Sequence, residues 1–215
     1  MSPSLSAGSI NQVLRRVPAW PVYLVGAVPF ALIVLQIVSG DLGADPVKTL
    51  ERALGEWGLK FVVVGLCITP LRWATGISLI KYRRAIGLLA FFYVALHLTT
   101  WVVLDLQFRW AEIGADLIKR PYIIVGMIGF LALLPLAITS NNLSVRRMGA
   151  AVWQKLHKLT YIAALAGAIH YMMLVKAWPL EPMLYLGAVV GLLALRAGRS
   201  WRRYQGIAAA AQTAK

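Results

Sequence analysis

The stretch AIGLLAFFYVALHLTTWVVL, residues 85–104, decides the fold class. Apart from His97 it contains no ionisable side chain other than one tyrosine, and it is long enough to cross a bilayer. A hydrocarbon core about 30 Å thick requires roughly 20 apolar residues in a helix, so this stretch predicts a transmembrane helix. A histidine inside such a helix is costly and usually functional, which makes His97 a candidate site residue.

Five further stretches have the length and apolar character of membrane spans. With the first they make six, at residues 20–38, 57–71, 85–104, 121–139, 152–175 and 180–195. We expect the second to begin upstream of residue 57, with Asp45 as its N-cap and Pro46 as its first helical residue. Pro29 and Pro135 lie within spans and are expected to kink them. The predicted fold is an all-α membrane protein, a six-transmembrane-helix bundle.

The composition supports a membrane protein and excludes other classes. The chain has 215 residues, of which 60% are hydrophobic and 14% charged, with a mean hydropathy of +0.70. Soluble domains are about 45–50% apolar and about 25% charged, and disordered chains are still more polar. The single cysteine, Cys67, excludes an internal disulfide and a cysteine-ligated metal cluster.

The charges indicate how the bundle is oriented. The net charge is +14, and all eight acidic residues fall in or beside the loops of one side, while most of the 22 basic residues fall on the other. The positive-inside rule then places both termini in the cytoplasm of a bacterium, with the chain multi-pass in the inner membrane. We expect a cytoplasmic segment at residues 1–19, the six-helix domain at 20–198 and a cytoplasmic tail at 199–215. Membrane lipid, and not nucleic acid, is the expected partner of this positive charge.

The chain has three histidines, His97, His157 and His170, and all lie in predicted spans. Imidazole is an axial ligand of haem iron, so all three are candidate ligands of that metal. His97 and His170 are expected at similar depth toward the periplasm, as one bis-histidine site. His157 precedes His170 by 13 residues, about 20 Å along a helix, as for a second haem. The alternative is that these histidines only form hydrogen bonds between helices.

His157 has no obvious imidazole partner. The positions on the third span that would supply one hold Arg83 and Arg84, which are expected either to pair with haem propionates or to act only as topology determinants. A 13-residue spacing places His157 and His170 about 140° apart around an ideal helix, so either the fifth span is distorted or the two face different gaps. The small residues at 163–168 either admit a flat macrocycle or pack helices.

The sequence resembles a known family, the haem-binding membrane subunit of bacterial periplasmic methionine sulfoxide reductase systems (MsrQ, formerly YedZ). That family belongs to the ferric-reductase-like transmembrane superfamily. The resemblance covers about residues 12–200. The stretches that carry it are LGADPVK (42–48), ITPL (68–71), ALHLTTW (95–101), RPYIIVG (120–126), ITSN (138–141), WQKLHKLTY (153–161) and IHYMMLVK (169–176).

The resemblance implies a function. Members bind b-type haem, one or two groups, and pass electrons across the inner membrane to a periplasmic molybdopterin-containing subunit that reduces methionine sulfoxide in oxidised proteins. The donors it implies are the quinone pool or a cytoplasmic flavin reductase, and FMN and quinone are further possible cofactors. The family's histidines map onto His97, His157 and His170. The chain would then be an electron-transfer subunit of an oxidoreductase system and not a self-contained enzyme.

Two other functions fit the same residues. One is a related haem-containing ferric reductase or quinol-linked cytochrome with a different acceptor. The other is a haem-free transporter or assembly factor that uses the histidines as proton relays. The loops at residues 39–56 and 105–120, with their mixed charges, are the expected docking surface for a redox partner. No internal repeat is evident in the sequence.

Overall fold

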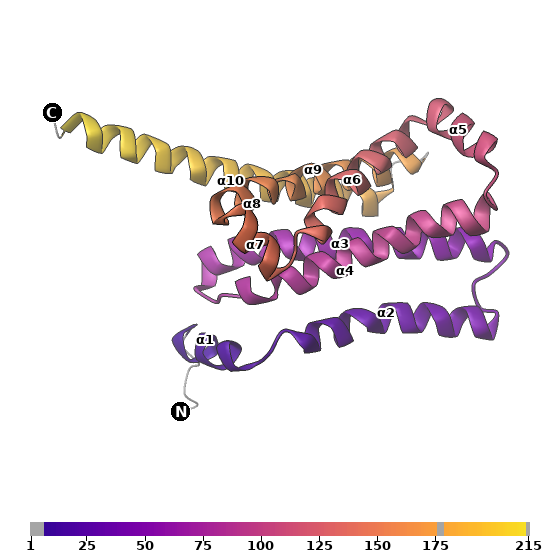
Figure 1. The fold of residues 1–215 in the computed structure, drawn as a ribbon, viewed down its shortest axis with the longest axis horizontal. Coiled ribbons are helices and arrows are strands. Elements are labelled where there is room, and N and C mark those ends of the chain that lie inside the picture. The colour runs from indigo at the N-terminus through magenta and orange to yellow at the C-terminus, as the bar shows by residue number, and fades with distance from the viewer. Residues whose placement is uncertain (1–6, 176–178, 214–215) are drawn as a thin grey trace.

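The structure is a computed structural model that describes residues 7–175 and 179–213, and in this part of the chain all regular structure is helical (Figure 1). The loop charges Lys176 and Lys215 lie outside the described residues. The helices are α1 (Ala7–Arg16), α2 (Trp20–Ser39), α3 (Pro46–Thr75), η1 (Ile80–Tyr82), α4 (Arg83–Thr99), η2 (Thr100–Asp105), α5 (Trp110–Lys119), α6 (Pro121–Ile138), α7 (Asn142–Met148), α8 (Ala150–Leu156), α9 (Leu159–Leu174) and α10 (Leu180–Thr213).

Five helices of the described chain are long and apolar enough to cross a membrane. They are α2, α3, the continuous run Ile80–Asp105 formed by η1, α4 and η2, α6, and the Leu180–Gly206 part of α10. The all-α membrane fold is therefore confirmed, with five candidate spans in place of six. The remaining expected span, at 152–175, is the one that the structure does not form as a single helix.

The segment 152–175 is not one continuous helix, and a distortion of this span, one of the two possibilities left open above, is observed where the backbone ladder is interrupted at His157 and Lys158. There the amide of Lys158 bonds to the carbonyl of Lys155 at 3.2 Å, a three-residue spacing in place of the four-residue one. The segment is divided into α8 and α9, and α9 has 16 residues. At 1.5 Å per residue α9 rises about 24 Å, less than the hydrocarbon thickness.

The expected start of α3 is confirmed. Pro46 is its first residue, and the Asp45 side chain caps the helix by accepting a hydrogen bond from the amide of Lys48 at 3.2 Å. The helix ends where Gly76 adopts φ +74°, a left-handed conformation that glycine adopts without strain. The upstream extension makes α3 30 residues long, so its first turns carry the loop charges at one end of the bundle.

The bundle is built from two helix pairs. α3 packs along α4, and α6 packs along α9, while α10 contacts both α9 and α3 (Figure 1). A buried cluster joins the two pairs to α10, and it includes Ala164 and Ala168 of α9, each 0% exposed. The small residues of α9 thus pack against neighbouring helices. The packing interpretation of residues 163–168 is the one that the structure supports.

The first span is tied to the bundle by one buried hydroxyl. The Tyr93 side chain on α4 is fully buried, and its hydroxyl donates to the carbonyl of Gly26 at 2.8 Å and accepts from the amide of Phe30 at 2.9 Å. These two backbone groups are four residues apart in α2, so the hydroxyl contacts both groups of one helical turn beside Pro29. The expected distortion of α2 at Pro29 therefore has a partner in α4.

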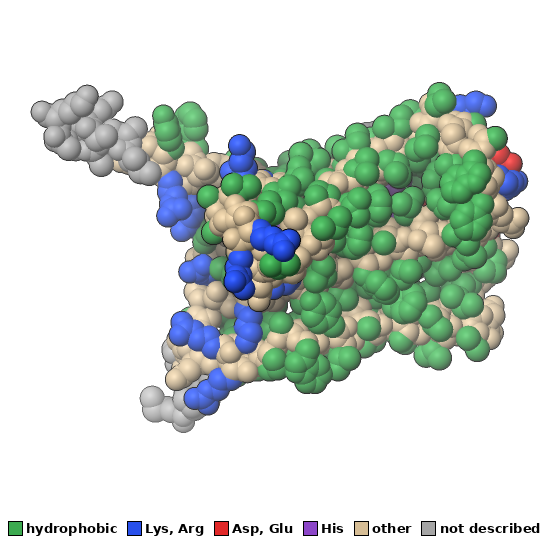
Figure 2. All heavy atoms as spheres, viewed as in Figure 1, with side chains coloured by type: hydrophobic (Ala, Val, Ile, Leu, Met, Phe, Trp, Pro, Cys, Tyr) green, Lys and Arg blue, Asp and Glu red, His purple; other side chains and the backbone are tan. Residues whose placement is uncertain are grey.

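The charged side chains gather at the two ends of the molecule. Lys and Arg side chains cluster at the end where α1 and the last described turns of α10 lie, and acidic side chains are visible only at the opposite end (Figure 2). Ion pairs between described residues join Lys48 to Asp45, Lys60 to Glu56, Arg109 to Glu112 and Arg120 to Asp116. Each is local in sequence, so the acids neutralise cations of their own loops.

Candidate functional site

The structure brings His97 and His170 together. His97 lies near the end of α4 and His170 near the end of α9, so each histidine comes from a different helix pair. Their ring centres are 6.1 Å apart and the ring planes meet at 76°. The two histidines expected to share one depth in the membrane are therefore neighbours in space.

Each of these rings is held by a backbone carbonyl of the partner helix in its own pair. The Nδ1 of His97 lies 2.8 Å from the carbonyl oxygen of Glu51 on α3, and the Nδ1 of His170 lies 2.7 Å from that of Tyr122 on α6. A carbonyl oxygen only accepts, so each Nδ1 carries the proton and donates it. The lone pair of each neutral ring is then on Nε2, the tautomer in which a histidine binds a metal.

A glycine one helical turn after each carbonyl makes room for the ring. A Cβ placed on Gly55 would lie 3.0 Å from the Nδ1 of His97, and one on Gly126 would lie 2.8 Å from the Nδ1 of His170. Both distances are shorter than side-chain carbons ordinarily approach, so any other residue would displace the ring. The glycine is thus required by the hydrogen bond that orients each histidine.

The two halves of the site repeat one arrangement. Gly55 and Gly58 on α3 form a G-x-x-G pattern against α4, and Gly126 and Gly129 on α6 form the same pattern against α9. The carbonyl that accepts from the histidine precedes the first glycine by four residues in both halves. The structure therefore contains a local repeat that was not evident from the sequence.

The donor set fits haem iron better than a free metal ion. Among the described residues there is no group of three or more His, Cys, Asp and Glu side chains that could hold an ion. Two imidazoles are the complete protein ligand set of a bis-histidine haem, because the macrocycle supplies the other ligands. His97 and His170, with ring centres 6.1 Å apart, are the two residues that would hold the haem iron here.

His157 lies apart from this pair, at the break between α8 and α9. Its ring stacks on Trp153 with centres 3.7 Å apart, and its Nε2 lies 3.2 Å from the hydroxyl of Thr139. That hydroxyl donates to the carbonyl of Pro135 at 2.6 Å, so it accepts from the Nε2 of His157. The lone pair of His157 is then on Nδ1. Its Nε2 makes a hydrogen bond to Thr139 at the end of α6, which is the kind of contact between helices that the alternative interpretation describes.

Arg83 and Arg84 point to different neighbours. The guanidinium of Arg83 bonds to the hydroxyl of Thr69 on α3, whereas Arg84 donates to the side chain of Asn142 at 2.8 Å. The positive charge of Arg84 acts on His157, and the positive charge of Arg196 acts on Arg83. Of the two arginines considered as propionate partners, Arg84 is the one whose charge acts on His157.

The sequence interpretation missed the backbone parts of the site. The carbonyls of Glu51 and Tyr122 and the glycines Gly55 and Gly126 carry no chemistry of their own, so residue type did not mark them. The signal that could have found them is the G-x-x-G pattern, which occurs near the start of two predicted spans. A small residue at this place lets a neighbouring side chain approach the helix backbone.

Comparison with known proteins places the chain among membrane redox components. A family described as "Ferric reductase like transmembrane component" matches residues 54–168. The matched region contains His97 and His157 and ends just before His170.

Individual relatives are similar over most of the chain. The "Protein-methionine-sulfoxide reductase heme-binding subunit MsrQ" of Brucella anthropi is 48% identical over 184 residues, which is 86% of this chain and 83% of that protein. The proteins of the same name from Brucella ovis and Brucella canis are 47% identical over the same shares of both chains. The aligned length leaves little of either protein unmatched.

Proposed function

The chain belongs to the MsrQ family of protein-methionine-sulfoxide reductase heme-binding subunits, within the ferric-reductase-like transmembrane components, and we propose that it is a b-type cytochrome of the bacterial inner membrane. It passes electrons to a periplasmic molybdopterin-containing methionine sulfoxide reductase and so supports the repair of oxidised periplasmic proteins. It is the electron-transfer subunit of that system and carries no catalytic site for sulfoxide reduction.

The observation that carries the proposal is the pairing of His97 with His170. A haem bound between them would supply reversible one-electron chemistry, with a potential tuned by its ligands and burial. The chain's own contribution is to orient both rings through the carbonyls of Glu51 and Tyr122 at 2.8 and 2.7 Å. The hydrogen bond at Nδ1 fixes the orientation and the tautomer of each ring. It also makes the Nε2 that would bind the metal more basic and limits movement of the ring.

A second haem is proposed at the opposite end of α9. His157 would bind it through a ring nitrogen, and Arg84 would pair with its propionates. This site requires the bond between His157 and Thr139 to rearrange if Nε2 is the ligand. Two sites separated along α9 would divide the membrane crossing into shorter electron transfers.

The topology proposed for this function has six crossings and both termini in the cytoplasm. In it α8 and α9 together make the fifth crossing, within a bundle that extends over residues 20–198. The segments 1–19 and 199–215 lie on the cytoplasmic side. The gathering of Lys and Arg at the end where the described termini lie supports this orientation (Figure 2).

The proposed donors are the quinone pool and a cytoplasmic flavin reductase. FMN and quinone are proposed as further cofactors, and no described residue is assigned to either. The acceptor would dock at the acidic end, on the segments 39–56 and 105–120, of which α5 presents Trp110 with 68% exposure. Because Arg109 and Glu112 pair with each other at 3.0 Å, the two charges there offset each other, and the exposed Trp110 ring adds apolar surface beside them.

A visible spectrum of the purified chain tests the proposed function. A Soret band, with a reduced-minus-oxidised spectrum of low-spin haem, is expected from the wild type and lost from a His97→Ala, His170→Ala double variant. A wild-type chain that is folded, supplied with haem and still without a Soret band would contradict the cytochrome assignment and favour a transporter or assembly factor.

A related ferric reductase or quinol-linked cytochrome with another acceptor remains the second candidate, because the broader family match covers that class. The identity of the electron acceptor distinguishes the two candidate functions. Reduced protein in proteoliposomes is expected to be reoxidised by the periplasmic sulfoxide reductase subunit far faster than by ferric chelates. The reverse order would assign the chain to the second class.

A further inference from the structure

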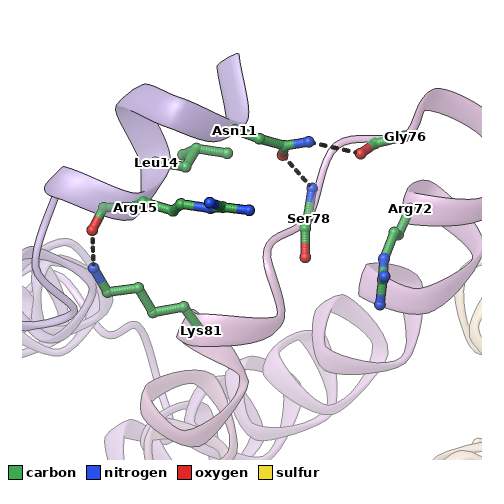
Figure 3. Close-up of a pocket in the computed structure, with 7 residues that line it drawn as sticks. All are labelled: Asn11, Leu14, Arg15, Arg72, Gly76, Ser78 and Lys81. Carbon is green, nitrogen blue, oxygen red and sulfur yellow. Dashed lines mark hydrogen bonds between the residues drawn. The ribbon is translucent and has the colours of Figure 1, made fainter. Parts of the chain in front are cut away.

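The N-terminal helix α1 is docked on the turn that joins α3 to η1. The side chain of Asn11 donates to the carbonyl of Gly76 at 2.9 Å and accepts from the amide of Ser78 at 2.8 Å (Figure 3). One side chain therefore satisfies both a donor and an acceptor of the turn. A segment expected only as a cytoplasmic lead-in is thus a fixed part of the fold.

The C-terminal end of α1 is fixed by two side chains from η1. The Nζ of Lys81 donates to the carbonyls of Arg15 and Val17 at 2.9 and 2.7 Å, and the hydroxyl of Tyr82 donates to the carbonyl of Leu14 at 3.1 Å. The last carbonyls of a helix have no partner within the helix, so these bonds cap it. The cap also holds the ammonium of Lys81 beside the Arg15 backbone.

A cavity of about 280 Å³ lies between α1 and this turn, and its lining includes Arg15, Arg72 and Lys81. No acidic residue lines it. The Arg15 guanidinium extends from α1 toward the turn, and Arg72 lies on the other side of that turn, in the last turn of α3 (Figure 3). Neither guanidinium has a hydrogen bond or ion pair with any residue in the part of the chain that the structure describes.

We propose that this cavity binds a phosphate group, that of the headgroup of an anionic phospholipid in the leaflet at the basic end of the bundle. Like charges gathered without a carboxylate repel each other, and a bound anion removes that repulsion. Guanidinium groups donate two parallel hydrogen bonds to phosphate oxygens, and two unpaired guanidiniums are available here. The side chains of Asn11 and Ser78 add polar atoms to the lining.

The position of the cavity favours a lipid over a free ion. One candidate span ends at Thr75 and the next begins at Ile80, so the turn between them lies at the membrane–water boundary. Beside it, Val13 on α1 is 60% exposed and Trp73 is 37% exposed, which suits contact with acyl chains and the interface. Basic residues just outside membrane spans attract anionic lipids. A lipid bound here would hold α1 flat against the membrane.

The test uses the full chain in nanodiscs and does not depend on haem binding. Retained lipid is measured by native mass spectrometry after release from nanodiscs of phosphatidylglycerol or of phosphatidylcholine. The variants are Arg15→Gln and Arg72→Gln, and the matched control is Arg16→Gln, an exposed neighbour that does not line the cavity. A melting temperature equal to that of the wild type shows that each variant is folded.

The wild type and Arg16→Gln are expected to retain phosphatidylglycerol in preference to phosphatidylcholine, with about a tenfold loss for each cavity arginine removed. Equal losses in Arg16→Gln and Arg15→Gln would show a general charge effect and overturn the proposal. A second measurement titrates inorganic phosphate against the lipid-bound protein. Phosphate that displaces the lipid at micromolar concentration, or that binds when the lipid does not, would overturn the assignment to a lipid.

Discussion

The imidazole rings of His97 and His170 meet edge to face where two helix pairs adjoin, with their centres 6.1 Å apart and their planes at 76°. Each ring is tied by its Nδ1 to a carbonyl on the neighbouring helix of its own pair. The lone pairs of both rings are thereby kept for a ligand that neither helix pair can hold alone. On the proposed function the two histidines act as one unit, and their substitutions should have one phenotype.

His97→Ala and His170→Ala are each expected to abolish the same low-spin haem signal. Loss of either ligand leaves a five-coordinate iron and lowers retention, so the haem content per protein should fall as well. Visible and electron paramagnetic resonance spectra of the purified variants measure both effects. If one substitution removes the signal and the other leaves it unchanged, the two histidines do not share a haem.

Gly126→Ala is expected to lower haem retention at the His97–His170 site by about tenfold, since loss of an outer-shell contact has this effect on bound metals. The reason is steric, because the added Cβ would lie 2.8 Å from the Nδ1 of His170 and would push the ring from the Tyr122 carbonyl. Gly87→Ala on α4 is the matched control, as a Cβ there would meet nothing within 4 Å. Equal haem content and equal reduction potential in the two variants would refute the steric argument.

His157→Ala is expected to remove or change a second haem while the His97–His170 signal is retained. Arg84→Gln should shift the same second signal, because Arg84 lies within reach of His157. Arg83→Gln is the control, since that side chain is bonded to Thr69 instead. A wild-type chain with one haem, unaffected by His157→Ala, would leave His157 as the partner of Thr139 and Trp153 alone.

Tyr93→Phe is expected to destabilise the bundle by about 1 kcal/mol, because it removes the buried hydroxyl that bonds to the carbonyl of Gly26 and the amide of Phe30. Tyr23→Phe on the exposed face of α2 should change the stability by much less. Unfolding in detergent, followed by circular dichroism, compares the two. Equal stability of the Tyr93 variant and the wild type would show that water or another group takes the place of the hydroxyl.

The proposed topology predicts that cysteines at Asp45 and Glu112 react with a membrane-impermeant reagent from the periplasm only. Cys67 is exposed on the surface of α3 and has to be replaced first, so that the introduced thiol is the single target. A cysteine at Arg147 serves as the cytoplasmic control. Labelling of the cysteine at position 45 from the cytoplasm would show that the bundle has the opposite orientation, and the proposed direction of electron transfer would then be wrong.

The sequence predicted those parts of the fold that depend on apolar length and on local chemistry. The Asp45 cap and the start of α3 at Pro46 follow from side-chain hydrogen bonding and the fixed φ of proline, and both are present. The place of the break at His157 was not predicted, because the 13-residue spacing of the histidines allowed a distortion without locating it, and hydropathy does not register a change from four-residue to three-residue backbone spacing. Such a change depends on the packing of Trp153 and Thr139 around the ring.

For the candidate site, the sequence predicted which histidine side chains to consider and not the backbone carbonyls that orient them. The 73-residue separation of His97 and His170 gave no direct sign of contact, and matching depth in two parallel spans was the argument that paired them. The carbonyl acceptors on α3 and α6 could not be predicted, since every residue has a carbonyl. Which one accepts from a histidine depends on how two helices pack.

The placement of the two histidines on separate helix pairs has a consequence for how the protein is made. When α4 leaves the ribosome and enters the membrane, the residues of α9 are still untranslated, so His97 is in the membrane before His170 has been synthesised. On the proposed function, the nascent chain cannot capture a haem that needs both rings. Cofactor loading is therefore a late step of biogenesis, and the inserted apoprotein is an obligatory precursor of the working cytochrome.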